Sequence, residues 1–133
     1  MALRGTATHF NAVHFLSKDI TFADDGETLS LGYLPAGAAV IDAFVIVSTA
    51  FNSGTSDVLD IGYADDGDEY ATDLDLTTAG KIAADELATA GNLLYTADET
   101  QITAAYTSAG TAPTAGAGTV VVLYVPTDNA PAG

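Results

Sequence analysis

The residues best suited to chemistry are the carboxylates of one short stretch, DIGYADDGDEYATDLDL, at positions 60–76. Seven of its seventeen residues are acidic. Carboxylates at this density can hold a hard cation, act as paired catalytic acids, or form the solvated side of a strand and its turn. The seven acids are Asp60, Asp65, Asp66, Asp68, Glu69, Asp73 and Asp75.

A calcium site of the helix–loop–helix type is excluded by the spacing of these residues. Such a loop needs oxygen ligands at alternate positions, a glycine at the sixth position and a glutamate at the twelfth. Counted from Asp65, Gly67 comes third and no glutamate closes the loop. An irregular cation site formed by Asp65, Asp66 and Asp68 stays open as a hypothesis.

Catalytic constellations are hard to assemble from the remaining residues. Glycoside hydrolysis needs two carboxyl groups across a cleft, one with a raised pKa, and Asp42 is the only acid whose apolar neighbours suggest burial. A strand end or a hydrogen bond at an oligomer rim explains Asp42 more simply. His9 and His14 are five residues apart and would point to opposite faces of one strand, and the chain has no cysteine. We therefore expect no enzyme, no metal centre and no cofactor.

The composition indicates a folded and strongly acidic protein. Hydrophobic residues make up 48% of the 133 residues and charged residues 16%, as in folded domains. Eighteen acids against three bases give a net charge of -15, so a phosphate backbone or an anionic membrane would be repelled. No apolar run approaches the length of a membrane span. We expect a single soluble domain over residues 1–133, made in the cytosol.

Apolar and polar residues alternate with a period of two along most of the chain, which indicates strands buried on one face. In the acidic stretch, this alternation places Asp60, Asp73 and Asp75 on the solvent side of two strands, with residues 65–69 in the turn between them. A solvated face and a hairpin turn are therefore the favoured interpretation of the seven acids.

Two segments, residues 38–51 and 118–125, are apolar on both sides and predict central strands. In so small a domain, two covered faces imply that one meets a second sheet and the other contacts another subunit. In the first segment the predicted faces are Ile41, Ala43, Val45 and Val47 on one side, and Val40, Asp42, Phe44 and Ile46 on the other. The predicted oligomer contacts are Val40, Phe44 and Ile46.

The remaining chain is consistent with further short strands. Residues 79–91 have helical propensity, but only enough for a single turn or one short helix. Roughly eight short strands separated by turns predict an all-β protein built as an antiparallel sandwich or barrel. The last residues, 126–133, are expected to form a flexible tail. The additional strands are predicted at residues 9–16, 20–22, 93–96 and 101–107.

Residues 31–62, LGYLPAGAAVIDAFVIVSTAFNSGTSDVLDIG, continued by DEYATDLDL and by LLYTADETQITAAYTSAGTAPTAGAGTVVVLYVP, resemble the small acidic capsid decoration (cement) proteins of tailed bacteriophages. The resemblance spans Leu29 to Pro126 and depends on the pattern of strands and turns. It implies a jelly-roll-like β-sandwich that is synthesised in the host cytoplasm and binds the outer capsid surface of the virion. There it would bridge major capsid protein subunits as a homo-oligomer, with a trimer favoured over a dimer. A phage tail or baseplate component, or a receptor-binding β module, is the alternative.

The N-terminal stretch MALRGTATHFNAVHF is the candidate segment for gripping the capsid. It combines one of the three bases with several apolar residues, and residues 1–8 would form an arm ahead of the first strand. A disordered end followed by an ordinary first strand would explain the same residues. The predicted capsid contacts are Arg4, His9, Phe10, Val13 and Phe15.

Overall fold

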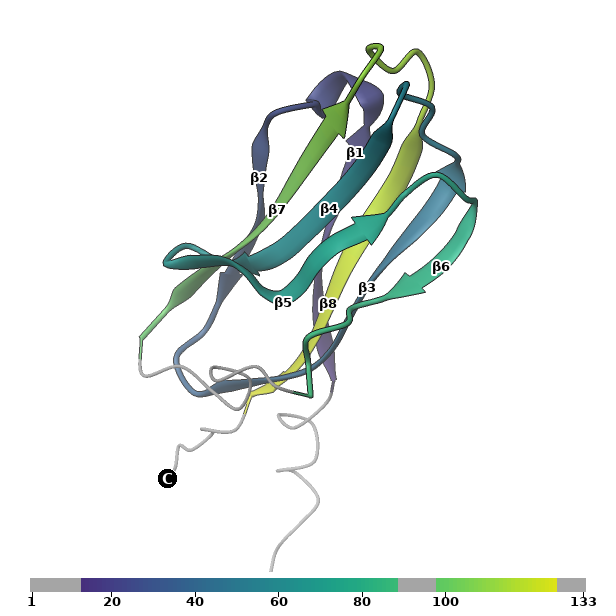
Figure 1. The fold of residues 1–133 in the computed structure, drawn as a ribbon. Helices are drawn as coiled ribbons and strands as arrows, with labels where there is room; N and C mark the ends of the chain where they lie inside the picture. The colour runs from purple at the N-terminus through teal and green to yellow at the C-terminus, as the bar shows by residue number, and fades with distance from the viewer. Residues whose placement is uncertain (1–12, 89–97, 127–133) are drawn as a thin grey trace, which may run out of the picture.

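The computed structural model describes residues 13–88 and 98–126 (Figure 1). This part of the chain contains eight strands and one short 3-10 helix, and none of its helices could cross a membrane. The elements are β1 (His14–Thr21), η1 (Phe22–Asp24), β2 (Thr28–Leu34), β3 (Ala38–Thr49), β4 (Ser56–Tyr63), β5 (Asp66–Asp75), β6 (Gly80–Ala83), β7 (Thr100–Ala109) and β8 (Ala117–Pro126).

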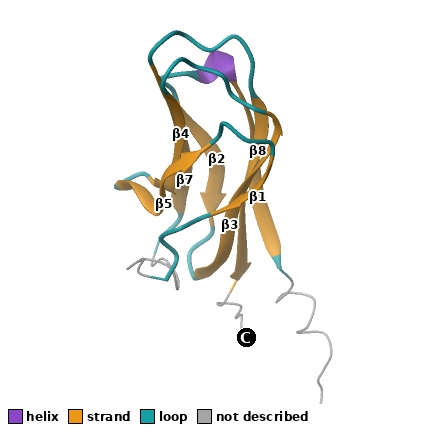
Figure 2. Ribbon diagram, turned by 45° about the vertical axis from the view of Figure 1, so that its right-hand side comes forward, coloured by secondary structure: helices purple, strands orange, loops and turns teal. Residues whose placement is uncertain are grey.

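The strands form two four-stranded antiparallel sheets that pack face to face (Figures 1 and 2). One sheet has the order β1-β8-β3-β6 and the other the order β2-β7-β4-β5. Successive strands thus cross between the sheets, except β4 and β5, which pair within one sheet, and this arrangement of eight strands is that of a jelly roll. The prediction of an all-β antiparallel sandwich is confirmed.

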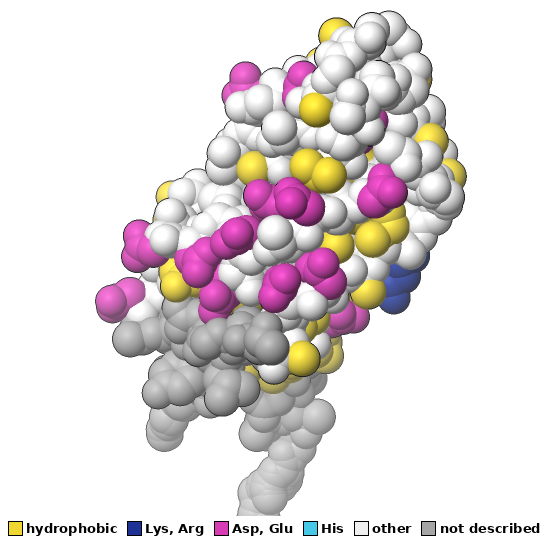
Figure 3. Space-filling view, in the orientation of Figure 1, with side chains coloured by type: hydrophobic (Ala, Val, Ile, Leu, Met, Phe, Trp, Pro, Cys, Tyr) yellow, Lys and Arg dark blue, Asp and Glu magenta, His cyan; other side chains and the backbone are white. Residues whose placement is uncertain are grey.

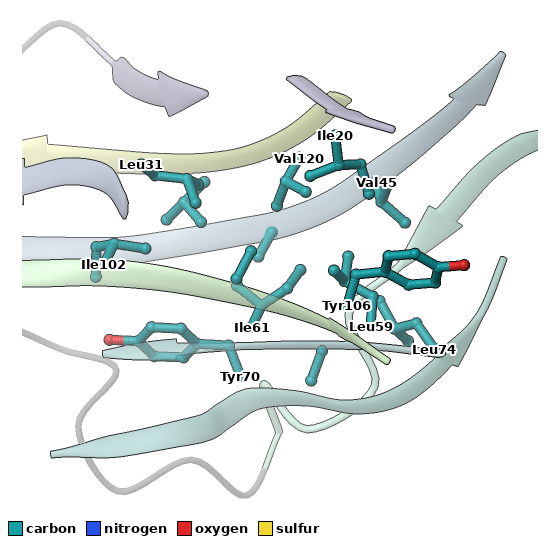
Figure 4. Packing of buried hydrophobic residues seen from close by; sticks show 14 of the residues in the cluster. Ile20, Leu31, Val45, Leu59, Ile61, Tyr70, Leu74, Ile102, Tyr106 and Val120 are labelled. Atoms are coloured by element: carbon teal, nitrogen blue, oxygen red, sulfur yellow. The ribbon is translucent and has the colours of Figure 1, made fainter. Parts of the chain in front are cut away.

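The core lies between the sheets. It is formed by every second residue of each strand, whose side chain faces inward. Val45 and Val120 of one sheet meet Leu59, Ile61 and Ile102 of the other, each with no exposed surface (Figure 4). Burying one such aliphatic side chain contributes about 1.5–3 kcal/mol relative to leaving it in water. The alternation read from the sequence therefore supplies the main stabilising contact of the fold.

One end of the sandwich is closed by hydrogen bonds between two connections. The side-chain oxygen of Asn52, in the β3–β4 connection, accepts from the backbone N–H groups of Thr114 (2.8 Å) and Ala115 (3.0 Å). The Asn52 amide nitrogen donates to the Thr114 hydroxyl at 3.0 Å. Figures 1 and 2 show these connections at the end of the molecule opposite the C-terminus. The loop between β7 and β8 is thus tied to the rest of the fold.

Two predicted elements differ from the structure. Residues 14–21 form one continuous strand, with no break between residues 16 and 20, and Phe22 begins η1. Residues 80–83 form strand β6, paired with Phe44–Val47 of β3, where a helical turn was predicted. The helical propensity of this segment is weak, and pairing with the open edge of β3 outweighs it. The predicted strand at residues 93–96 lies outside the described residues.

A bulge in β3 changes the predicted faces of that strand. Val40 pairs with Tyr124 and Asp42 with Leu123, so Ile41 is an extra residue without an opposite partner. As a result Val40 is 3% exposed and belongs to the core, whereas Ile41 is 48% exposed. The predicted faces are wrong for these two residues. They are confirmed beyond the bulge, where Ala43, Val45 and Val47 are buried.

Candidate interaction surface

The two sheets differ sharply in charge. The strands of the sheet β2-β7-β4-β5, here called the acidic sheet, contain seven acids and no base. The strands of the other sheet contain two aspartates, Asp19 and Asp42, and two lysines, Lys18 and Lys81. Figure 3 shows the carboxylates gathered over β4 and β5. The seven acids of the acidic sheet are Asp57, Asp60, Asp66, Asp68, Glu69, Asp73 and Asp75.

The solvent-side acids are held in place by local hydrogen bonds. Asp73 adopts a left-handed backbone conformation (φ 54°), and its N–H donates to a side-chain oxygen of Asp60 at 2.7 Å. Asp75 accepts from the hydroxyl and the backbone N–H of Thr77, and these bonds lower the pKa of Asp75. The predicted solvent side of these strands is confirmed for Asp73 and Asp75, which are exposed, while Asp60 is half-buried beside its partner.

The predicted turn at residues 65–69 is shorter in the structure. Tyr63 pairs directly with Asp66, so β5 begins at Asp66 and only two residues form the turn. A hydrogen bond with Asp66 raises the pKa of Asp68, because two neighbouring carboxyl groups hold a proton more readily than one. Within the described residues, no group of three or more His, Cys, Asp or Glu side chains is arranged to hold a metal ion.

Among the residues that the structure describes, the buried acid is Asp57, and the expectation that Asp42 is buried is wrong. Asp57 has no exposed surface, and it accepts from the Tyr106 hydroxyl (2.6 Å) and the Ser53 N–H (2.9 Å). Burial and the bond to Asp57 raise the pKa of Tyr106. Asp42 is only half-buried and accepts from the N–H of Ala43. The alternation already places Asp57 on the side of Leu59, a signal that the sequence reasoning missed.

The outer side of the sheet β1-β8-β3-β6 is rich in exposed hydrophobic residues. Phe15 is 63% exposed and Ile46 45% exposed, and between them lie Phe44, Val121 and Leu123, all half-buried. The register places Phe15 beside Leu123, and Val121 beside Phe44. We call these five residues the apolar face. Exposed apolar side chains gathered on one face mark interaction surfaces more often than scattered ones do.

Charged groups border the apolar face on three strands. Asp42 of β3 pairs with Leu123 and so projects to the same side, where it is half-buried. The Lys81 ammonium lies over the ring of Phe44, 4.7 Å from its centroid. At the other edge of the sheet, the Thr119 hydroxyl donates to Asp19 at 2.9 Å. The stem of Lys81 therefore extends the hydrophobic surface while its charge stays in water.

The structure brings together residues that the sequence assigned to two different contacts. Phe15 was predicted to touch the capsid, and Phe44 and Ile46 to touch another subunit, yet all three lie on the apolar face. Val13, 56% exposed, immediately precedes β1, and Val40 is in the core. The contributions of Val121 and Leu123 were missed, although the alternation in residues 118–125 could have revealed them. The predicted contacts Arg4, His9 and Phe10 lie outside the described residues.

Comparison with solved structures finds the same fold in three phage capsids. The chain is similar to a chain of the cyanophage Pam1 capsid asymmetric unit (19% identity, TM-score 0.67, 94% of this chain and 91% of that chain). It is also similar to a chain in the acid-stable capsid of Helicobacter pylori bacteriophage KHP30 (15%, 0.68, 89% and 91%) and to one in the capsid of Ralstonia phage GP4 (20%, 0.65, 90% and 86%). At these identities the likeness establishes a shared fold. No protein-family model and no curated protein matches the chain.

Proposed function

We propose that the chain is a capsid decoration protein of a tailed bacteriophage. It would be a structural virion component without enzymatic activity that binds the outer surface of the head. The observation that carries this proposal is the fold, which this chain shares, over about nine tenths of its length, with chains from three phage capsids. The exposed hydrophobic residues Val13 and Phe15, at the start of β1, support it, because a jelly roll that acts by surface contact needs an exposed hydrophobic surface.

The proposed mechanism is additive burial at many identical contacts. One standard interface buries about 800 Å² on each partner, and a head displays many copies of the same site. Val13 and Phe15, together with Arg4, His9 and Phe10 of the N-terminal stretch, would contact the major capsid protein. Each bound copy would bridge neighbouring capsid subunits, so that the lattice separates only when many contacts are lost together.

The acidic sheet would then be turned away from the capsid. Its carboxylates other than the buried Asp57 would lie on the solvent side and keep neighbouring particles apart by like-charge repulsion. Such a surface repels DNA and anionic membranes, so neither is a proposed partner. This arrangement uses the charge difference between the two sheets to define the orientation of the protein on the head.

The proposal is tested by adding the purified chain to expanded heads that lack it. We expect saturable binding at micromolar concentration and a higher temperature of head disruption. Phe15→Asp should weaken binding about tenfold or more, since it places a charge in a desolvated contact. The matched control is Tyr33→Asp, because Tyr33 is 54% exposed on β2 of the acidic sheet. Heads that remain bare and equally fragile would refute the proposal.

A tail or baseplate component, or a receptor-binding module, would use the same fold with a different partner. In that case the chain would bind host cells or a glycan array and leave bare heads unoccupied. The same two assays therefore separate the alternatives.

A further inference from the structure

We infer that the apolar face is a self-complementary interface, and that its occupant is a second copy of this chain related by a two-fold axis. The proposal concerns the free protein and does not depend on capsid binding. Two residues of opposite charge in the sheet β1-β8-β3-β6 point to this arrangement.

Asp19 and Lys81 occupy opposite edges of one row across this sheet. Asp19 of β1 pairs with Thr119 of β8, Thr119 with Ile46 of β3, and Ile46 with Lys81 of β6. Directly paired residues of antiparallel strands project to the same face. The row therefore reads acid, hydroxyl, aliphatic, base from one edge to the other, and spans about 14 Å at the usual strand spacing.

A two-fold axis that runs along the strands, midway between β8 and β3, exchanges the two edges of this row. When two copies stack on their apolar faces about this axis, Asp19 of each copy lies over Lys81 of the other. Ile46 then lies over Thr119, and in the next row Phe44 lies over Val121. The Asp19–Lys81 ion pair therefore forms twice, once on each side of the axis, as an isologous interface requires.

The distribution of charge favours a second copy over other occupants. A chain with net charge -15 would repel its own kind through most orientations. Stacking on the apolar faces places the two acidic sheets on opposite outer sides of the pair, as far apart as the fold allows. Of the charged residues on these strands, Lys18 pairs with the buried Val120 and so projects to the other side of the sheet. Asp19, Asp42 and Lys81 project to the apolar face, which therefore carries a net charge of only -1 per copy.

This geometry selects a dimer over the trimer implied by the family resemblance. A sheet face that stacks on its own counterpart is consumed by one partner and closes with two copies. Phe15 lies one row beyond the end of β6, at the margin of the stacked area, with Val13 still further out. The N-terminal side of β1 is thus left available for another partner.

Sedimentation equilibrium of the full chain tests the proposal in the absence of any capsid. We expect a mass that approaches twice the 13.4 kDa of one chain as the concentration rises to about 100 μM. Ile46→Asp should shift the protein to the monomer, with a dissociation constant raised about a hundredfold. The control Tyr33→Asp, which adds the same charge on the acidic sheet, should leave the mass unchanged. A monomer or a trimer for the unmodified chain would overturn the inference.

The pairing of Asp19 with Lys81 of the second copy gives another test, which does not depend on replacing a hydrophobic residue. Asp19→Lys and Lys81→Asp should each raise the dissociation constant about tenfold, because like charges then face each other. The double variant should restore the original constant, since it only reverses the direction of both ion pairs. Circular dichroism should show that every variant is folded. A double variant as weak as either single variant would refute the two-fold arrangement, whatever the outcome of head binding.

Discussion

The buried carboxyl group of Asp57 links two parts of the fold through hydrogen bonds. Its carboxylate has no exposed surface, yet both oxygens accept a hydrogen bond, one from the Tyr106 hydroxyl and one from the Ser53 N–H. The Tyr106 ring also packs edge-on against Phe51, with centroids 4.9 Å apart. The carboxylate therefore joins the β3–β4 connection to β7 inside the fold, and it has no exposed surface to present to a substrate.

Replacing Asp57 should destabilise the fold, and the loss should be larger when more hydrogen-bond donors lose their acceptor. We expect Asp57→Leu to lower the free energy of unfolding by about 3 kcal/mol, because the buried Tyr106 hydroxyl and the half-buried Ser53 N–H lose their acceptor. Asp57→Asn keeps one acceptor oxygen and should cost about 1 kcal/mol. Urea unfolding at neutral pH measures both values. Equal stability of Asp57→Leu and the unmodified chain would show that the two hydrogen bonds of Asp57 contribute nothing to the stability of the fold.

The buried phenol of Tyr70 should make the folded protein less stable at alkaline pH. Its side chain is buried, and desolvation raises its pKa from 10.0 to about 12. The folded protein thus holds this proton at a pH where the unfolded chain releases it. The stabilising contribution is complete below pH 10 and is lost as the pH rises toward 12, by up to about 3 kcal/mol.

The Tyr70→Phe variant isolates this effect. It should unfold with a smaller dependence on pH between about 10 and 12 than the unmodified chain. Tyr33→Phe, which removes an exposed phenol, should retain the original dependence. Urea midpoints across this pH range measure the difference, and identical slopes for Tyr70→Phe and the unmodified chain would contradict the assignment. The raised pKa of Tyr106 adds to the same alkaline loss in all three proteins.

At the scale of elements, the period-two pattern predicts the strands well and their connections less well. The alternation in residues 28–34 and 58–63 corresponds to β2 and β4, and both apolar segments are inner strands of one sheet. The bulge at Ile41 was not predictable from β3 alone, because it arises from the register with β8. Strand β6 was missed for the same reason: pairing with β3 decides its conformation.

The candidate surface could be predicted residue by residue but not as a whole. Phe44 and Ile46 were recognised because their strand is apolar on both faces, and Phe15 because it belongs to the N-terminal stretch that combines Arg4 with apolar residues. Their common location depends on the strand order β1-β8-β3-β6, which places segments more than a hundred residues apart side by side. No local sequence pattern encodes this strand order. The prediction therefore assigned residues of one surface to two separate contacts.

The β7–β8 connection depends on a glycine that contacts the core. Gly116 has a positive φ of 148°, and a Cβ at this position would overlap the ring of Phe51. We expect Gly116→Ala to lower the free energy of unfolding by about 3 kcal/mol, through backbone strain and displacement of a buried ring. Gly26 has a positive φ of 82° but open space around it, so Gly26→Ala should cost only about 1 kcal/mol. Thermal unfolding of the two variants measures the difference, and equal losses would show that the Phe51 contact is irrelevant.

At the scale of the whole molecule, the charge difference between the sheets separates two ways of binding a capsid. Contact through the hydrophobic residues of β1 would depend on burial, which salt does not screen. Contact through the acidic sheet would require a basic partner surface and would depend on Coulomb attraction. The two modes therefore respond to ionic strength in opposite directions.

We expect binding to bare heads to stay constant or to tighten as NaCl rises from about 50 mM to about 500 mM, over which the screening length falls roughly threefold. Salt weakens the repulsion between acidic sheets of neighbouring copies and leaves the contact of Val13 and Phe15 intact. Cosedimentation of the protein with heads measures the dissociation constant at each concentration. In the same assay, the combined change Asp73→Asn and Asp75→Asn should not weaken binding, because both side chains face solvent on the acidic sheet. A dissociation constant that rises tenfold with salt, or with these two substitutions, would place the capsid contact on the acidic sheet and reverse the proposed orientation.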